Sequence, residues 1–346
     1  MNSEEHQPDA PNLTRRAFTS LALATAAAAA TAGATTASQV LAQTRSRSEV
    51  MTMRGMNAQP QRQTVDGRPN AALQIRKALK VGMIGVEGPL EAKFAAAREA
   101  GFDGVELDSP GPYKAHEVEV AKKNTGIEVP GVVLSTHWNK PFNHPDPGVR
   151  REAADALRTA IRDCRDFGGS TVLVVPAVVN QSMSYVDAYE RSQAEIRPMI
   201  AIAREHEVAI AFENVWNGFL LSPMEAARYV DELQPQVDHS KRTVGWYFDI
   251  GNIVNFGWPE HWIDALGPRI IKLDVKEFSR KRRDDEGLWK GFGVEIGEGD
   301  VGWDRVREAL RRIGFAGWAA AEVGGGGPDR LKDIARRMDR VFGLKA

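Results

Sequence analysis

The feature that most constrains the fold is an eightfold alternation of short apolar segments and amphipathic segments after residue 80. The apolar segments have the length and composition of buried strands, and they lie at 80–84, 104–107, 131–135, 171–176, 209–213, 245–249, 270–275 and 318–322. Segments with a helical period follow them at 90–100, 115–124, 147–167, 185–206, 223–233, 259–266, 303–313 and 328–342. Eight strand–helix units in about 270 residues match the size of a (β/α)8 barrel. The sequence therefore predicts a single α/β TIM barrel over residues 79–346.

An open, doubly wound sheet is the alternative fold for such an alternation. It would normally carry a glycine-rich phosphate-binding motif after its first strand. The segment 82–88, Gly-Met-Ile-Gly-Val-Glu-Gly, has the wrong glycine spacing for that motif. We therefore prefer the closed barrel.

The first 42 residues differ in composition from the rest of the chain. Arg15 and Arg16 precede an Ala/Thr/Leu-rich run at 21–37, and the tripeptide 40–42 offers the small residues that a signal peptidase needs. Paired arginines before such a run resemble a twin-arginine export signal. We expect residues 1–42 to be a cleaved signal peptide and the mature protein to be periplasmic.

The alternative for this segment is an uncleaved membrane anchor. The run is rich in Ala and Thr and is broken by Gly33, so it is a poor membrane span and no stable span is expected after processing. Residues 43–78 are rich in Gln, Arg, Met and Asn without an apolar period, which is typical of a flexible linker.

Charge and cysteine content exclude several classes of protein. The chain has 45 basic and 46 acidic residues, so its net charge of −1 argues against a nucleic-acid partner. Cys164 is the single cysteine, which excludes an intramolecular disulfide and a thiolate metal cluster. Nothing in the composition opposes a homo-oligomer.

Five predicted strands carry an acid near their carboxyl ends, and these acids are Glu106, Glu213, Asp249, Asp274 and Glu322. In a barrel the carboxyl ends of all strands converge on one mouth. Carboxylates packed together repel and raise one another's pKa unless a cation or a proton intervenes. The pattern therefore favours a shared divalent metal site, although any one of these acids alone would also fit a solvated or salt-bridged loop position.

Several short motifs also carry a family resemblance, which extends from residue 80 to 344. They are Gly-Phe-Asp-Gly-Val-Glu-Leu at 101–107, Ala-Phe-Glu-Asn at 211–214, Phe-Asp-Ile-Gly-Asn at 248–252, Gly-Glu-Gly-Asp-Val-Gly-Trp at 297–303, and Gly-Phe-Ala-Gly-Trp at 314–318 before Ala-Glu-Val at 321–323. With these motifs the sequence resembles the sugar phosphate isomerase/epimerase family, which has a xylose-isomerase-like barrel, includes ketose 3-epimerases and is distantly related to endonuclease IV. Endonuclease chemistry needs several histidines in a trinuclear zinc site. This chain has only seven histidines in all, so we do not expect endonuclease activity.

The resemblance implies a metal held by Glu, Asp, His and Glu from strands five to eight. The matching positions are Glu213, Asp249, Asp274 and Glu322, so Asp274 stands where the family has histidine. Four carboxylates offer only hard oxygen donors, which favours Mn²⁺ or Mg²⁺, with Co²⁺ and Zn²⁺ as alternatives. Strand alternation also places Lys272 and Lys276 on the face of Asp274, so neutralisation of Asp274 by a lysine is the alternative to metal ligation.

The resemblance further implies a reaction. In the family, two glutamates move a proton alpha to a sugar carbonyl through an enediolate, and the matching residues are Glu213 and Glu322. We expect a sugar isomerase or epimerase (EC 5.1 or 5.3 type) that acts on a small, non-phosphorylated carbohydrate, because sugar phosphates are chiefly cytoplasmic. A 3-keto-glycoside lyase or hydrolase with the same metal–enolate chemistry and a non-catalytic sugar-binding barrel are the alternatives. The expected substrate contacts are Glu106, His137, Trp216, Asn252 and Lys276. A capped loop histidine is an equal alternative for His137, and loop packing is an equal alternative for Trp216. The charged loop at 278–302 fits either a lid or partner surface, or a solvated flap.

Overall fold

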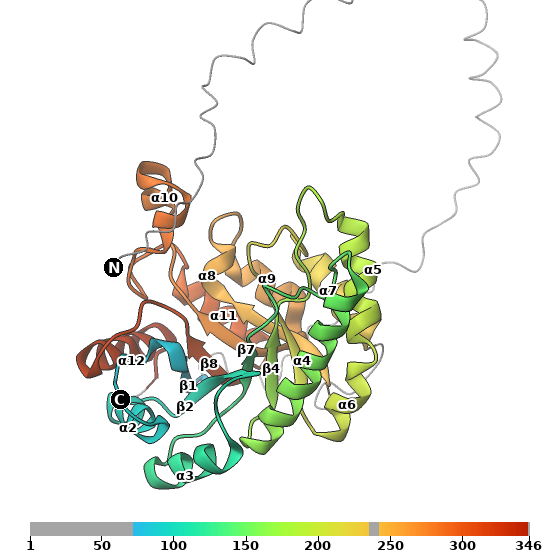
Figure 1. Cartoon of the computed structure of the whole chain (residues 1–346). Helices are drawn as coiled ribbons and strands as arrows, with labels where there is room; N and C mark the ends of the chain where they lie inside the picture. Colours follow the sequence, from blue (N-terminus) through green and yellow to red (C-terminus); the bar gives the residue numbers. More distant parts are fainter. Residues whose placement is uncertain (1–71, 235–241, 345–346) are drawn as a thin grey trace, which may run out of the picture. The chain divides into compact units, whose positions relative to one another are not determined.

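Eight parallel strands form a closed barrel in the order of the sequence (Figure 1). The computed structural model describes residues 72–234 and 242–344. The strands are β1 (Gln74–Lys80), β2 (Gly104–Ser109), β3 (Val132–Leu134), β4 (Thr171–Val174), β5 (Ala209–Glu213), β6 (Val244–Asp249), β7 (Ile270–Val275) and β8 (Ala316–Ala321). The predicted (β/α)8 barrel is confirmed. The expected signal at 1–42 and residues 43–71 of the expected linker lie outside the described residues.

Helices cover the outside of the barrel, as the ribbon in Figure 1 shows. The helices are α2 (Leu90–Ala100), α3 (Ala115–Thr125), α4 (Pro147–Asp166), α5 (Tyr185–Ile196), α6 (Met199–Glu205), α7 (Pro223–Leu233), α8 (Ile250–Ile253), α9 (Pro259–Leu266), α10 (Arg280–Glu286), α11 (Trp303–Arg312) and α12 (Pro328–Phe342). Of these, α10 projects away from the barrel and buries none of its residues. Short 3₁₀ turns lie at Val81–Met83 (η1), Gly267–Arg269 (η3) and Leu288–Phe292 (η4). In the part of the chain that the structure describes, no helix is both long enough and apolar enough to cross a membrane.

The first strand begins earlier than the sequence indicated. We expected a strand at 80–84, but β1 ends at Lys80 and the next three residues form η1. Residues 74–78, which we assigned to the linker, pair instead with β8 from the partners Gln74 and Ala316 onward. The apolar alternation of residues 81–84 comes from a buried turn. As a consequence, Lys80 lies at the carboxyl end of a strand and faces the mouth of the barrel.

One predicted helix is divided in two. The segment 185–206 forms α5 and α6, with Pro198 between them. Proline has no N–H to donate to the preceding turn and its ring collides with that turn, so one continuous helix cannot pass through this position.

The inside of the barrel is lined by small apolar residues together with long polar side chains. A cluster separate from the main core contains Ala78, Leu173, Ala211, Tyr247 and Ala320. The small residues leave room for Lys272, which is 2% exposed. Gly131 is needed here as well, because a Cβ at that position would lie 2.6 Å from Lys272 Nζ. The barrel therefore encloses charged groups directly beneath its mouth.

Candidate functional site

Four carboxylates meet at the carboxyl ends of consecutive strands. Glu213 ends β5, Asp249 ends β6, Asp274 lies in β7 opposite Asp249, and Glu322 directly follows β8. Each side chain offers one oxygen, and these four oxygens all lie within 4.8 Å of one another. Asp249 and Asp274 are completely buried, and Glu213 is nearly so. The structure thus brings together the four residues that the sequence indicated as metal ligands.

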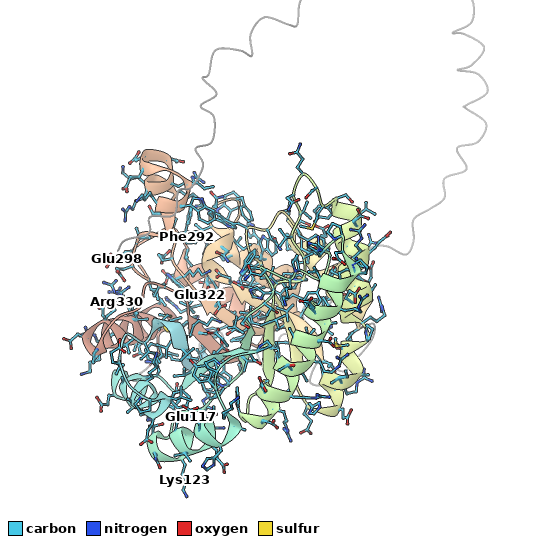
Figure 2. The ribbon with its side chains drawn as sticks, viewed as in Figure 1. Glu117, Lys123, Phe292, Glu298, Glu322 and Arg330 are labelled. Atoms are coloured by element: carbon cyan, nitrogen blue, oxygen red, sulfur yellow. The ribbon has the colours of Figure 1, made fainter. Side chains whose placement is uncertain are left out.

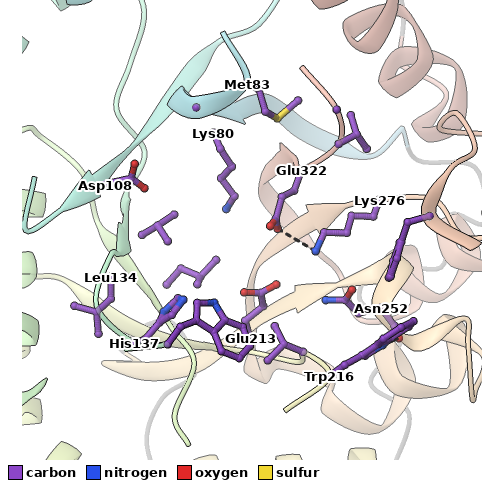
Figure 3. Close-up of a pocket in the computed structure, with 18 of the residues that line it drawn as sticks. Lys80, Met83, Asp108, Leu134, His137, Glu213, Trp216, Asn252, Lys276 and Glu322 are labelled. Atoms are coloured by element: carbon purple, nitrogen blue, oxygen red, sulfur yellow. Dashed lines mark hydrogen bonds and ion pairs between the residues drawn. The ribbon is translucent and has the colours of Figure 1, made fainter. Parts of the chain in front are cut away.

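Two lysines enter this cluster. Lys276 Nζ lies 2.9 Å from Asp249 Oδ2 and 3.3 Å from Glu322 Oε2, and Figure 3 shows the second of these contacts. Lys80 Nζ lies 2.9 Å from Asp274 Oδ1. A lysine does therefore pair with Asp274, but it comes from β1. Lys80 is not among the predicted site residues, because the predicted first strand begins at this residue, whereas β1 ends there.

Glu106 lies beneath the cluster and does not line the cavity above it. Its carboxylate accepts hydrogen bonds from Lys80 Nζ at 2.7 Å, Lys272 Nζ at 3.0 Å and the Tyr247 hydroxyl at 2.8 Å. Burial alone would raise the pKa of Glu106, but Lys80 and Lys272 outweigh it and lower this pKa to about 2. We expected Glu106 to contact substrate; the structure places it outside the cavity lining, with its oxygens occupied by three barrel side chains and the residue 1% exposed.

The lysines near the four carboxylates above Glu106 do not fully offset the negative charge of these carboxylates. Burial, reinforced by Glu322, raises the pKa of Glu213 well above its usual value. Burial also raises the pKa of Asp274 well above its usual value despite the ammonium of Lys80, and it raises that of Asp249 despite Lys276. For Glu322, the lysine charges outweigh burial and lower the pKa. The two lysines thus neutralise the cluster only in part.

The charge balance and one unpaired atom both fit a divalent cation. Glu106 and the four clustered carboxylates face three lysines, so two negative charges remain when all eight groups are ionised. Asp274 Oδ2 is buried and has no hydrogen-bond donor among the described residues. A buried carboxylate oxygen without a partner is costly, and hard divalent cations prefer such oxygens. This buried acidic cluster can therefore bind a divalent metal.

A cavity of about 880 Å³ opens above the cluster (Figure 3). Glu213, Glu322, Lys80 and Lys276 line its floor, whereas Asp249 and Asp274 lie below the surface of that floor. Four of the five residues that we expected to contact substrate line this cavity: His137, Trp216, Asn252 and Lys276.

His137 has a fixed orientation in the wall of the cavity. Its Nδ1 accepts a hydrogen bond from the Val175 backbone N–H at 3.3 Å, and the residue is 5% exposed. Burial lowers the pKa of His137 to about 4, so the imidazole is neutral near pH 7. Since Nδ1 is the acceptor, the ring hydrogen is on Nε2, and His137 can donate a hydrogen bond through that atom.

Asn252 connects the acidic cluster to an aromatic wall. Its backbone N–H donates to Asp249 Oδ1 at 2.8 Å, and its side-chain amide donates to the Asn214 carbonyl at 2.9 Å. The Trp216 indole N–H donates to the Asn252 carbonyl at 2.8 Å. These contacts hold Asp249 and Trp216 in place, so Asn252 serves the site through its backbone as well as through its position in the wall.

The loop at 278–302 closes one side of the cavity. Trp289 and Phe292 line the cavity from η4, and their ring centroids lie 4.9 and 5.0 Å from that of Trp216. Glu277 anchors the loop by accepting hydrogen bonds from the backbone N–H groups of Gly297 and Val301 and from the Trp303 indole. No pattern in the sequence predicts that the aromatic residues of this charged loop line the cavity. Asp108, at the end of β2, is a further lining residue that the sequence analysis missed.

Comparison with known proteins identifies the family. The chain matches the xylose isomerase-like TIM barrel family over residues 94–341 and belongs to it. L-ribulose-5-phosphate 3-epimerase UlaE from Escherichia coli is 24% identical over 255 residues, which cover 70% of this chain and 82% of that relative. The curated relatives thus include sugar epimerases.

Solved structures show the same fold at low sequence identity. The 3-keto-D-glucoside 4-epimerase YcjR from E. coli superposes with a TM-score of 0.61 at 14% identity, covering 78% of this chain and 99% of that chain. The IolI protein with a bound zinc atom has a TM-score of 0.61 at 16% identity and covers 78% and 98% of the two chains.

Proposed function

We propose that this protein is a metal-dependent sugar epimerase or isomerase that moves a proton alpha to the carbonyl of a non-phosphorylated sugar. The observation that carries the proposal is the convergence of Glu213, Asp249, Asp274 and Glu322 within 4.8 Å at the floor of an open cavity. The sugar epimerases among the relatives support the reaction class. Export to the periplasm through the expected signal at 1–42 is part of the same proposal.

The four clustered carboxylates would hold the cation. Oxygen donors alone favour Mn²⁺ or Mg²⁺, although a protein of the same fold carries zinc. Such a cation supplies polarisation of the sugar carbonyl and stabilises the enediolate charge that develops when the neighbouring C–H bond is broken.

The proton transfer belongs to Glu213 and Glu322. They come from β5 and from the end of β8, and both line the cavity. If one carboxylate takes the proton from the carbon alpha to the carbonyl and the other returns a proton on the opposite face, the configuration of that carbon is inverted. His137 donates from Nε2 to a sugar oxygen, and Lys276 holds Glu322 in position.

The charges around the cavity support a substrate without phosphate. The basic side chains in the described lining are Lys80 and Lys276, and both are already paired with carboxylates. Asp108 and Glu277 add further negative charge to the lining. Arg and Lys side chains are common phosphate ligands, and the two that line this cavity are already paired with carboxylates, so the charge of the lining favours a ligand without phosphate.

Solvent deuterium exchange tests the proposed reaction. The protein is loaded with Mn²⁺ and incubated in D₂O with free ketoses and with 3-keto sugars, and deuterium at the carbon alpha to the carbonyl is measured by NMR. We expect exchange, and at least a hundredfold loss in Glu213→Gln and Glu322→Gln. The control is Glu117→Gln on α3, which Figure 2 shows at the outer surface away from Glu322. Exchange that is equal in all four proteins would contradict the assignment of the two glutamates.

Metal analysis tests the cofactor separately. We expect about one divalent ion per chain in the purified protein and its loss in the double variant Glu213→Gln/Asp249→Asn. Full exchange activity in wild-type protein that has been freed of metal would refute the metal-dependent mechanism.

A further inference from the structure

Two exposed tryptophans line the mouth of the cavity. Trp138 is 51% exposed and Trp289 is 68% exposed, and both belong to the cavity lining. Large aromatic side chains left open to water at the edge of a cavity are typical of a binding surface. Trp258 is equally exposed, at 51%, but it is not among the lining residues, and the Arg280 guanidinium lies over its ring.

The two indoles come from opposite sides of the barrel. Trp138 is in the loop after β3, and Trp289 is in η4, after β7. In a closed barrel of eight strands in sequence order, β3 and β7 are four positions apart and therefore face each other across the axis. Trp289 is supported from behind by Trp216, whose ring centroid is 4.9 Å away. A ligand that rises from the floor would pass between two aromatic surfaces.

The cavity is larger than the proposed chemistry requires. Its volume of about 880 Å³ is near the upper end of the 300–1,000 Å³ that is usual for ligand pockets. The acidic floor needs only one sugar ring, so the space at the rim remains for another group. Asp108 also lines the cavity and is exposed, so its carboxylate can accept hydroxyl hydrogens from a ligand.

We propose that this rim binds a second ring and that the substrate class is therefore a keto-glycoside, with its keto sugar at the floor and its glycosidic partner between Trp138 and Trp289. The inference rests on the proposed function, because it is the acidic floor that selects the keto ring. A sugar ring presents C–H bonds on its faces and hydroxyls at its edge. It can therefore pack against the electron-rich face of an indole and keep its hydroxyls in water or on Asp108. A second protein copy over the same surface would close the route to the floor.

Matched substrates test the second-ring site. A 3-keto-hexose is compared with its glycosides that carry a glucosyl or a phenyl group, and kcat/KM for solvent deuterium uptake is measured with the Mn²⁺-loaded full chain. We expect a preference of at least tenfold for the glycosides. In Trp138→Ala and Trp289→Ala we expect the ratio of glycoside to free sugar to fall about tenfold, mainly through KM. In Trp258→Ala, the matched control outside the cavity, the ratio should not change.

The possible outcomes test the second-ring site and the proposed reaction independently of each other. Equal kcat/KM for free sugar and glycoside, or an unchanged ratio in both cavity variants, would overturn the second-ring site and leave the proposed reaction standing. If no sugar exchanges deuterium, the proposed reaction fails. The second-ring site is then tested by titrating the protein with a non-reactive phenyl glycoside and monitoring the binding by indole fluorescence. Binding that is about tenfold weaker in Trp289→Ala supports the site, and unchanged binding overturns it. Dissociation of an oligomer in Trp289→Ala, with the glycoside ratio unchanged, would make the rim an interface between copies and also overturn it.

Discussion

His137 shows how one backbone contact decides what a side chain can do. The Val175 N–H occupies Nδ1, and burial keeps the ring neutral, so the imidazole is a hydrogen-bond donor toward the cavity across the physiological pH range. A free histidine would gain a proton near pH 6.5. In the folded protein the His137 imidazole instead stays neutral at that pH.

The depressed pKa of His137 predicts a pH-dependent stability. Because the folded pKa is about 4 and the unfolded one about 6.5, the unfolded chain binds the proton more readily between these values. The contribution of His137 is therefore full above pH 6.5 and is lost as the pH falls toward 4. We expect this loss to lower the free energy of unfolding by about 2 kcal/mol between pH 7.5 and pH 5. Urea titrations in EDTA should show a flatter pH dependence for His137→Gln than for wild type.

The exposed His116 provides the control for this measurement. His116→Gln should keep the wild-type pH dependence, since this side chain lies on the surface of α3. If the stability of His137→Gln falls with decreasing pH as steeply as that of wild type, another group causes the pH dependence.

At the scale of the elements, one buried carboxylate makes three of the hydrogen bonds that hold the loop after β7. Glu277 Oε2 accepts hydrogen bonds from the Gly297 N–H and the Trp303 indole, each at 2.8 Å, and Oε1 accepts from the Val301 N–H at 3.2 Å. The loop passes so close that a Cβ on Gly299 would lie 2.7 Å from Glu277 Oε1. A buried side chain one residue before the loop thus contributes to the position of Trp289 in the cavity wall, together with the packing of Trp289 on Trp216.

Glu277→Gln should loosen this loop without disrupting the barrel. The amide nitrogen would face donors that have no other acceptor, and each buried unsatisfied group costs about 1–3 kcal/mol. We expect faster trypsin cleavage at the basic residues of α10 together with a weaker preference for glycosides over free sugars. Glu286→Gln on the exposed surface of α10 is the control. Cleavage at the wild-type rate in Glu277→Gln would show that the loop is held by other contacts.

The elements also show what the sequence could predict. Six helices and strands have the predicted bounds without change, for example β5 (Ala209–Glu213), β7 (Ile270–Val275) and α12 (Pro328–Phe342), because strand composition and N-terminal prolines mark them locally. The start of β1 could not be located in this way, since residues 74–77 form strand pairs with β8 alone and their sequence has no apolar alternation that marks a strand. The same error concealed Lys80, and with it the ion pair that determines how much negative charge remains in the site.

For the whole molecule, the important quantity is the charge enclosed by the barrel. Lys80 pairs with both Asp274 and Glu106, Lys272 pairs with Glu106, and Lys276 pairs with Asp249 and Glu322. With Glu213 added, and with all eight groups ionised, these pairs leave an excess of two negative charges over the barrel interior and its floor. That excess predicts that folding stability and cation binding are coupled, because an ion that binds only the folded barrel stabilises it.

Lys80→Met should strengthen this coupling. Removing one ammonium raises the excess to three negative charges and leaves Asp274 with a cation as its remaining source of positive charge. Breaking a buried ion pair from one side typically costs about 3–5 kcal/mol, so the metal-free variant should melt well below wild type. Adding Mn²⁺ should then raise its Tm by more than that of wild type, and should not raise the Tm of Glu213→Gln/Asp249→Asn. Calorimetry with and without EDTA measures all three proteins. Equal Mn²⁺ shifts in Lys80→Met and wild type would mean that Lys80 does not compete with the cation for Asp274, and that the charge balance of the barrel does not control metal affinity.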